Sequence, residues 1–439
     1  HQHTDHLRTT GMALLATLVI AIFGFMLIGV PIAFAIIAGS IVAILLFVPG
    51  ANLMIVPQQV YGGLDSFTLL AIPCFLLAGS LMTAGGLTDR LLAFTNTVLG
   101  RFRGGLAMSN VFAATVFAGI SGSAVADTSA LGRVLIPAMK REGYGPAFSA
   151  AVTASSNVLA PIIPPSIAFI VMGVLTNQSI TRLFLAGVII GLVYGLAMLV
   201  ITAIIAQIRQ YPVHGKASAK EIWTSFRGAI WALMMPVFII FGIRTGIFNV
   251  TECSAIAVVY ALFVGTVVYR ELTLKGIYQA LAETARLTAV IMIVVGAARI
   301  FSWILGYAGL PQQIANAILM VTDSPWVFLI LLNILLLIVG MFMEANAALI
   351  MLVPVLFPIA LQLGLDPIHV SVVIVVNLCI GLITPPVGLC LNLTSLIARV
   401  PLEQSTREVL PFLGFALLVL ALLTFVPGLA TWFPNLLLG

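Results

Sequence analysis

The sequence predicts an all-α, polytopic membrane protein built from two repeats of opposite topology. Composition is the first reason: 62% of the residues are hydrophobic and 8% are charged, whereas soluble proteins carry about 25% charged residues. The second reason is a set of glycines and prolines that recurs at a constant offset of 221 residues. Because these residues dictate backbone conformation, their match indicates one backbone used twice. The matched positions are Gly119 and Gly340, Pro137 and Pro358, Gly143 and Gly364, Pro146 and Pro367, and Pro164–Pro165 and Pro385–Pro386.

The third reason is a charge asymmetry between the two copies. Residues 86–146 contain six Lys or Arg residues, whereas residues 311–367 contain none. Lys and Arg accumulate on the cytoplasmic side of a membrane, so the copies are expected to enter it from opposite sides. Such an inverted repeat is typical of secondary transporters. The net charge of +5 is spread over short loops without a basic run, which argues against nucleic-acid binding.

The order of elements follows from the apolar spans. Residues 1–11 are polar, either an appended stretch or the cut end of a longer precursor. Uninterrupted spans are predicted at 12–29, 31–48, 66–85, 183–206, 228–247, 253–269, 285–306 and 408–432, and amphipathic interfacial arms at 86–103 and 309–322. The resulting segments are 1–11, 12–105, 106–180, 181–325, 326–399 and 400–439. The polar central loop, 207–227, is predicted to be cytoplasmic and the C-terminus, which lacks Lys and Arg, periplasmic.

Segments 106–180 and 326–399 are each predicted to form a re-entrant hairpin followed by a broken helix. Hairpin legs of about 15 residues are short for crossing a bilayer. In the first segment the tip is residues 119–123, and the following helix breaks at Ala160–Pro165. The second segment has its tip at residues 340–346 and its break at Gly381–Pro386.

These tips and breaks are the candidate functional site. Lipid cannot satisfy the carbonyls and amides that a broken helix exposes, so these groups must line a cavity or contact a ligand. A C-terminal half-helix end favours a cation such as Na⁺, and an N-terminal end favours an anion. The alternative is that the prolines and glycines are only kinks and packing contacts. Two matched Pro-Pro breaks, each paired with a small-residue tip, favour the functional interpretation.

Four charged side chains lie within predicted membrane segments. Asp127 and Arg133 are on the return leg of the first hairpin, where pairing with other groups would give them structural roles. Glu344 lies at the second tip and aligns with Ser123 of the first repeat; a carboxylate at that depth is expected to be functional. Arg299 could offer a bidentate contact to a substrate carboxylate or act as a membrane-edge anchor.

Two blocks of sequence resemble a known family. Residues 117–169 (FAGISGS to IIPPSIAF) and 340–389 (GMFMEAN to ITPPVGL) are similar to the large membrane subunit of a tripartite ATP-independent periplasmic (TRAP) transporter, the DctM-like family. The resemblance extends over essentially the whole chain from Met12. It implies an elevator-type architecture, in which the interrupted segments form a transport unit that moves against a scaffold of the remaining spans.

The resemblance also implies the physiological setting. The chain would be a multi-pass protein of the bacterial inner membrane and a secondary transporter subunit rather than an enzyme. It would work with a small four-helix membrane subunit and a soluble periplasmic substrate-binding protein. Na⁺ would be the coupling ion, without any other cofactor or transition metal. The transported organic acid would be a C4-dicarboxylate, sialic acid or a sugar acid.

Site residues carried over by motif form two Na⁺ sites, made mostly of backbone carbonyls. The first set is Ser121, Ser123, Ala160, Ile163 and Pro165, and the second is Gly340, Gly381, Thr384 and Val387. Candidate substrate-binding residues are Ser123, Asn157, Ser166, Glu344, Asn346 and Arg299. Two positions stand out: Ala160 replaces the glycine of the second repeat, and Glu344 stands where many family members carry Asp.

Other function classes are less consistent with the sequence. An intramembrane enzyme would need a catalytic pair or HExxH, and none of the five histidines lies deep in a predicted span. A primary pump would need a nucleotide site, and GxxxxGK[ST] is absent from the sequence. A passive channel or scaffold subunit, and a Na⁺-coupled carboxylate carrier that works without a binding protein, remain as alternatives.

Overall fold

The computed structural model describes residues 2–48, 50, 52–213, 215, 217–309, 313 and 324–438. Regular structure within these ranges is helical, and eight of the described helices are long and apolar enough to cross a membrane. This agrees with the predicted polytopic all-α class. The predicted second arm, 309–322, falls almost entirely outside the described residues.

The N-terminal spans are present, with one addition. The first two spans meet at a turn where Gly29 has a φ of +89°, a backbone region that favours glycine. The polar start continues the first span as helix from Gln2. The third span is extended by a helix that the sequence did not predict. The elements are α1 (Gln2–Leu27), α2 (Ile32–Phe47), α3 (Ile55–Leu64), η1 (Phe67–Leu70) and α4 (Ala71–Ala84).

The first interrupted segment has the expected order of helices. Pro146 begins the broken helix at a position where its missing N–H costs no hydrogen bond. Ser166 caps the helix that continues after the break. The elements are the arm α5 (Leu87–Leu99), the hairpin α6 (Gly105–Ser121) and α7 (Ala124–Arg141), and the broken helix α8 (Pro146–Asn157) and α9 (Ile167–Thr176).

The middle of the chain contains the longest helices. The central connection comprises residues 209–218, shorter than the predicted 207–227, because the flanking helices extend into it. Capping boxes at Ser218 and Asn249 begin two of the helices. The elements are α10 (Ile180–Ile208), α11 (Ala219–Arg244), α12 (Val250–Phe263) with a π-helical turn η2 (Val264–Val268), and α13 (Leu274–Tyr307).

The second interrupted segment repeats the order of the first. The predicted last span, 408–432, is divided: α19 ends at Phe425, and a separate helix follows Pro427. The elements are the hairpin α15 (Pro325–Phe342) and α16 (Ala345–Gln362), the broken helix α17 (Pro367–Gly381) and α18 (Leu389–Ala398), then α19 (Leu402–Phe425) and α20 (Gly428–Leu438).

The hairpin legs are longer than predicted. They measure 17 and 18 residues in the first hairpin and 18 and 18 in the second. Both legs of the second hairpin are long and apolar enough to cross a bilayer, whereas neither leg of the first meets both criteria, so the length argument for re-entry does not extend to the second hairpin. Re-entry stays a prediction that rests on the contact between each tip and its break, described below.

Helices of the two repeats pack against each other. The return leg of hairpin 1, α7, packs against α18 of the second broken helix, and α16 of hairpin 2 packs against α9 of the first. Lys140 at the end of α7 donates a 2.9 Å hydrogen bond to the carbonyl of Ala398, which ends α18. A cation at a helix C-terminus also favours the helix dipole. Neither repeat therefore completes its packing alone.

Packing separates two groups of helices. One group contains α2, α3, α4, α12 and α13, with α5 against α11. The other contains both hairpins and both broken helices, together with α10, α19 and α20. This differs from the predicted division at residues 181 and 400, because an uninterrupted apolar span does not reveal in sequence which neighbour it packs against.

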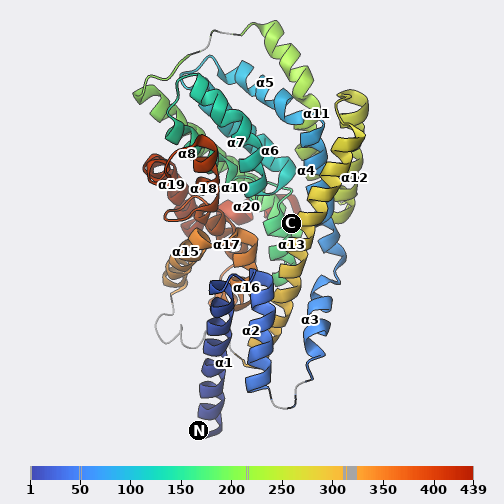
Figure 1. The fold of residues 1–439 in the computed structure, drawn as a ribbon, viewed down its shortest axis with the longest axis vertical. Helices are drawn as coiled ribbons and strands as arrows, with labels where there is room; N and C mark the ends of the chain where they lie inside the picture. The colour runs from blue at the N-terminus through green and yellow to red at the C-terminus, as the bar shows by residue number, and fades with distance from the viewer. Residues whose placement is uncertain are drawn as a thin grey trace.

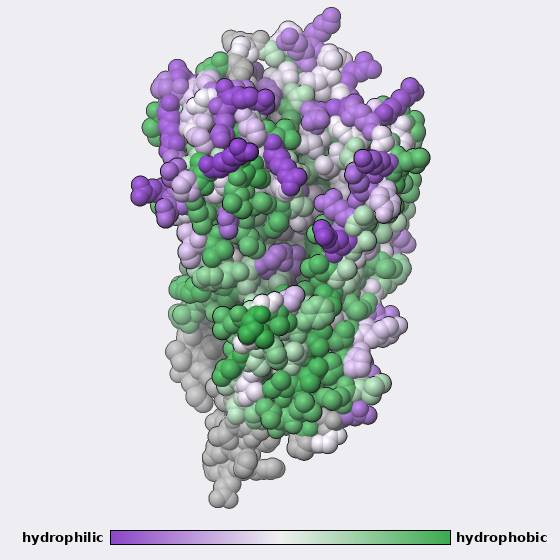
Figure 2. Space-filling view, viewed as in Figure 1, coloured by the Kyte–Doolittle hydropathy of each residue, from purple (hydrophilic) through white to green (hydrophobic). Residues whose placement is uncertain are grey.

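The molecule has two chemically different ends. Figure 1 shows α5 and the start of α11 at the upper end, and α1, α2 and α3 at the lower end. Hydrophilic side chains gather over the upper end in Figure 2, above a broad hydrophobic surface. Two ion pairs join helices among the described residues: Arg90 with Glu271 at 2.7 Å, and Arg209 with Glu408 at 2.8 Å. Hydrogen bonding to Arg90 lowers the pKa of Glu271.

Candidate functional site

The first hairpin tip is a tight turn against the first break. Ser121 ends α6, and Ser123 caps α7 by accepting from the Ala126 amide. Between them, Gly122 has a φ of +67°, and a Cβ there would lie 2.6 Å from the carbonyl oxygen of Pro165. Glycine is therefore required by both conformation and space. The Ser123 amide donates a 3.3 Å hydrogen bond to the hydroxyl oxygen of Ser121.

The first break leaves buried carbonyls without donors. All residues from 158 to 166 are buried. Within the described chain, no hydrogen-bond donor reaches the carbonyl oxygens of Ala160, Ile163 or Pro165. Buried carbonyls are almost always paired, so three together indicate a place for a cation or water. Ser166 is occupied locally: its hydroxyl donates to the Pro161 carbonyl at 2.5 Å and accepts from the Phe169 amide at 3.1 Å.

The second tip is organised around Glu344. Its carboxylate caps α16, accepting hydrogen bonds from the Asn346 amide at 2.9 Å and the Ala347 amide at 3.2 Å. It also accepts from the Asn346 side chain at 2.9 Å. Glu344 and Asn346 are both half-buried. The two predicted substrate residues are thus adjacent and mutually bonded, and the carboxylate stabilises the start of the helix.

The second break touches the second tip through backbone atoms. A Cβ on Gly381 would lie 2.6 Å from the backbone of Gly340, so the two glycines allow direct backbone contact. The Gly388 amide donates a 3.2 Å hydrogen bond to the Met341 carbonyl. The Thr384 hydroxyl donates to the Ile380 carbonyl at 2.9 Å, which leaves its own oxygen free to accept or to bind a cation. Thr384 and Val387 are half-buried.

Most predicted site residues are brought together, but not all of them. Contacts between tip and break bring Pro165 against the turn between Ser121 and Ser123, and Gly340 against Gly381. Asn157 is buried at the end of α8; its amide group donates to the Thr153 carbonyl, while its Oδ1 has no partner. Arg299 is exposed and lines a separate cavity of about 420 Å³ between α3, α9, α13 and α16. The part of α16 that lines this cavity begins at Val353, about 13 Å along the helix from Glu344.

Four side-chain contacts were not anticipated from the sequence. The Ser121 hydroxyl donates a hydrogen bond to Asp127 Oδ1 across the tip. In the second repeat, the Asn377 side chain donates to the Asn333 side chain at 2.6 Å, and Asn333 donates to the Thr424 hydroxyl at 2.9 Å. In the first, Asn110 donates to the Thr153 hydroxyl at 2.7 Å.

The links from Asn110 to Thr153 and from Asn377 to Asn333 join each hairpin to its own broken helix. The available signal was polar residues at similar places in both repeats, within otherwise apolar helices. Arg133, by contrast, is exposed and forms neither of the two ion pairs found among the described residues. The predicted pairing of Asp127 with another group is found with the Ser121 hydroxyl.

A second cavity lies beside the first tip. Its volume is about 220 Å³, and it is lined by α4, α6, α7 and α13. Ser121 and Asp127 contribute from the hairpin side, and Gln279 and Glu283 from α13. This cavity therefore lies between the two packing groups, next to the first predicted Na⁺ set.

Comparison with known proteins identifies the family. Residues 19–429 match the family described as "Tripartite ATP-independent periplasmic transporter, DctM component". The sialic acid TRAP transporter large permease protein SiaM of Vibrio cholerae is 40% identical over 416 residues, covering 95% of this chain and 97% of that protein. The C4-dicarboxylate TRAP transporter large permease protein DctM of Pseudomonas aeruginosa is 42% identical over 371 residues, covering 84% and 87%.

A solved structure shares the fold. The YdaH transporter of Alcanivorax borkumensis superposes with a TM-score of 0.64 over 88% of this chain and 91% of that one, at 17% identity. At that identity the likeness concerns the fold alone. The match of the family description over nearly the whole chain, together with the two large permease proteins, shows that the chain belongs to the DctM family of tripartite ATP-independent periplasmic transporters, as a large permease subunit.

Proposed function

We propose that this subunit imports an organic acid across the bacterial inner membrane, driven by Na⁺ and by an elevator movement. The observation that carries the proposal is the first junction, where Gly122, between Ser121 and Ser123, lies against the carbonyl of Pro165, one of the buried carbonyls of the break without donors among the described residues. Neutral oxygen ligands suit a hard cation such as Na⁺. The second junction offers the Thr384 hydroxyl and the backbone of Gly340, Gly381 and Val387 in the same relation.

The substrate class follows from relatives and tip chemistry. Two relatives are named for sialic acid and C4-dicarboxylates, which share carboxylate groups. The N-terminal ends of α7 and α16 lie at the two tips, and their positive ends of the helix dipole favour an anion, although Ser123 and Glu344 already accept first-turn amides there. We propose Ser123 and Asn346 as substrate contacts, with Glu344 setting the position of the second tip. Arg299, in its separate cavity, is proposed as an outer contact at most.

The elevator proposal is supported by the two packing groups. The group with both hairpins, α10, α19 and α20 would be the transport unit, and the other would be the scaffold. Small residues line their contact: a Cβ on Gly79 of α4 would lie 3.2 Å from the Ile120 carbonyl, and one on Gly119 would lie 2.7 Å from Pro236 of α11. The scaffold would also hold the small membrane subunit, and a periplasmic binding protein would deliver the substrate.

Uptake into vesicles tests the coupling. The chain would be reconstituted with its small subunit and binding protein, and uptake of sialic acid and of succinate measured with and without a Na⁺ gradient. We expect uptake only with the gradient and the binding protein. Ser123→Ala should raise the Na⁺ requirement, and Thr384→Val should do so if the threonine hydroxyl is a ligand. Wild-type uptake that ignores Na⁺ would contradict the proposal.

Disulfide cross-linking tests the movement. In a cysteine-free background, Gly79→Cys should cross-link to Ile120→Cys in the conformation described here. Ile72→Cys lies about 10 Å further along α4 and should cross-link to Ile120→Cys only after an outward shift. Locking either pair should stop uptake, and reduction should restore it. A locked Gly79 pair that still transports would show that the unit does not move.

A further inference from the structure

Asp127 is a buried carboxylate with one oxygen unused. It is 1% exposed, its Oδ1 accepts the Ser121 hydroxyl, and its Oδ2 has no hydrogen-bond partner in the part of the chain that the structure describes. Arg133, on the same helix, is exposed. A buried charge of this kind is costly unless something compensates it. The carboxylate also lines the cavity of about 220 Å³ beside the first tip.

The second repeat lacks this group. The position that aligns with Asp127 is Ala348, and the carboxylate of that repeat, Glu344, aligns with Ser123. Glu344 accepts two backbone amides and one side-chain amide, so its charge is largely used by the start of α16. Asp127, in contrast, accepts only the Ser121 hydroxyl among the described groups. The two junctions thus differ in the position of the carboxylate and in the number of hydrogen bonds that it accepts.

The geometry connects Asp127 to the proposed first Na⁺ site. Ser121 donates its hydroxyl hydrogen to Asp127 and accepts the Ser123 amide, so one lone pair of its oxygen remains for a cation. The other candidate ligands are neutral. A carboxylate hydrogen-bonded to a ligand makes that ligand more electron-rich and fixes its orientation. It also supplies the charge that the neutral oxygens lack.

We infer that Asp127 is the positioning residue and the compensating charge of the first Na⁺ site. The inference rests on the proposed Na⁺ coupling and deepens it. The second site, without such a group, would bind Na⁺ more weakly unless the substrate contributes charge. The two ions would then bind unequally, with the first able to bind in the absence of substrate.

Thermal unfolding of the purified permease complex tests this without transport. The unfolding midpoint would be followed from low to high NaCl, with choline chloride keeping the ionic strength constant, because a bound ligand raises stability in proportion to its occupancy. Asp127→Asn should raise the Na⁺ concentration that gives half of the maximal increase in the unfolding midpoint by about tenfold or more. This concentration is called the half-effect concentration below. The matched control is Glu283→Gln, which removes a charge from the same cavity and should shift it less than about twofold.

A double-mutant cycle identifies the route of the effect. If Asp127 acts through Ser121, the double variant Asp127→Asn with Ser121→Ala should need no more Na⁺ for its half-effect than the single variant that needs more. Asp127→Asn with Thr384→Val should be additive, because Thr384 belongs to the other junction. Additivity between Asp127 and Ser121, or an Asp127→Asn response equal to wild type, would overturn the inference.

Two further outcomes are distinguishable. A wild-type protein without any Na⁺ response would refute Na⁺ coupling itself, whereas a wild-type response with an unaltered Asp127→Asn variant would refute only the role of Asp127. If Asp127→Asn does not yield folded protein, Asp127→Glu takes its place. Since it keeps the charge, it should retain a Na⁺ response, and a folded Asp127→Glu variant that ignores Na⁺ would overturn the inference.

Discussion

The two tip–break junctions use one backbone plan in different surroundings. In the first, every residue of the break is buried, and Gly79 and Pro236 lie against the tip. In the second, Pro386 is exposed, and Phe342 beside the tip is 57% exposed. Symmetry in the sequence therefore does not mean symmetry in accessibility. Among the described residues, helices outside the repeats cover the first junction and leave the second partly exposed.

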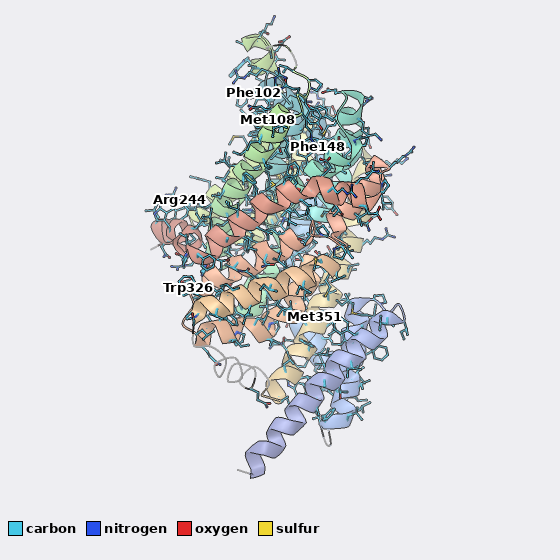
Figure 3. All side chains as sticks on the ribbon, turned by 90° about the vertical axis from the view of Figure 1, so that its left-hand side faces the viewer. Phe102, Met108, Phe148, Arg244, Trp326 and Met351 are labelled. Carbon is cyan, nitrogen blue, oxygen red and sulfur yellow. The ribbon has the colours of Figure 1, made fainter. Side chains whose placement is uncertain are left out.

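The largest expected effect concerns the orientation of the two repeats. Figure 3 shows Phe102 and Phe148, at the base of the first repeat, well above Trp326, at the base of the second. In a cysteine-free background, Lys140→Cys should react with an impermeant maleimide only after permeabilisation, and Gln362→Cys should react in intact cells. Both side chains are exposed. Labelling of both from the same side would end the inverted-repeat interpretation.

A smaller effect should distinguish the two breaks. A Cβ on Gly381 would meet the backbone of Gly340, whereas the aligned Ala160 already carries a methyl group without such contact. Gly381→Ala should lower the free energy of unfolding by about 1–3 kcal/mol and impair uptake. Ala160→Gly should cost about 0.5–1 kcal/mol. Unfolding in mixed micelles measures both, and equal costs would show that the breaks are packed alike.

The polar links between hairpin and broken helix should be of similar strength in both repeats. Asn377→Leu removes the hydrogen bond to Asn333, and Thr153→Val removes the acceptor of Asn110. Each loss is expected to cost about 0.6–1.7 kcal/mol, the range for hydrogen bonds between membrane helices. The same unfolding measurement applies. A difference of more than about 2 kcal/mol between the two would show that the networks are not equivalent.

The smallest expected effect is at the contact between the repeats. Lys140→Met removes the hydrogen bond to the Ala398 carbonyl but keeps most of the side-chain volume. Because Lys140 is exposed, the loss should be below about 1 kcal/mol, and high salt should reduce it. Lys140→Arg is the control and should be nearly neutral. A large effect of Lys140→Met would assign this lysine more than a capping role.

The sequence predicted best what glycine and proline dictate. The helix ends, the tips and the Pro-Pro breaks occur where these residues stand, because they restrict the backbone locally. The contacts that the sequence did not predict are between different helices. Ser121 and Asp127 are six residues apart on two different helices, so helical spacing could not pair them. The grouping of α10 and α19 with the repeats depends on tertiary packing, which hydropathy does not encode.

Charge in an apolar span was the least reliable guide. Hydropathy gives no depth or facing direction, so Arg299 was grouped with the tips although it lines another cavity. Arg133 and Asp127 were given the same expectation of structural pairing because both are charged, yet Arg133 is exposed and Asp127 is buried. Glu344 was correctly placed at a tip. Its role at the start of α16 depends on backbone amides that only the fold brings within reach.

The packing of helices from one repeat against helices of the other has a consequence for biosynthesis. The bond from Lys140 to Ala398 joins residues 258 positions apart, so α7 leaves the ribosome long before α18 exists. At about 5–20 residues per second, the wait is roughly 13–50 s. Throughout that interval the first hairpin, with its buried carboxylate, lacks the neighbour that covers it. The insertion machinery or a membrane chaperone must shelter it until translation reaches the second repeat.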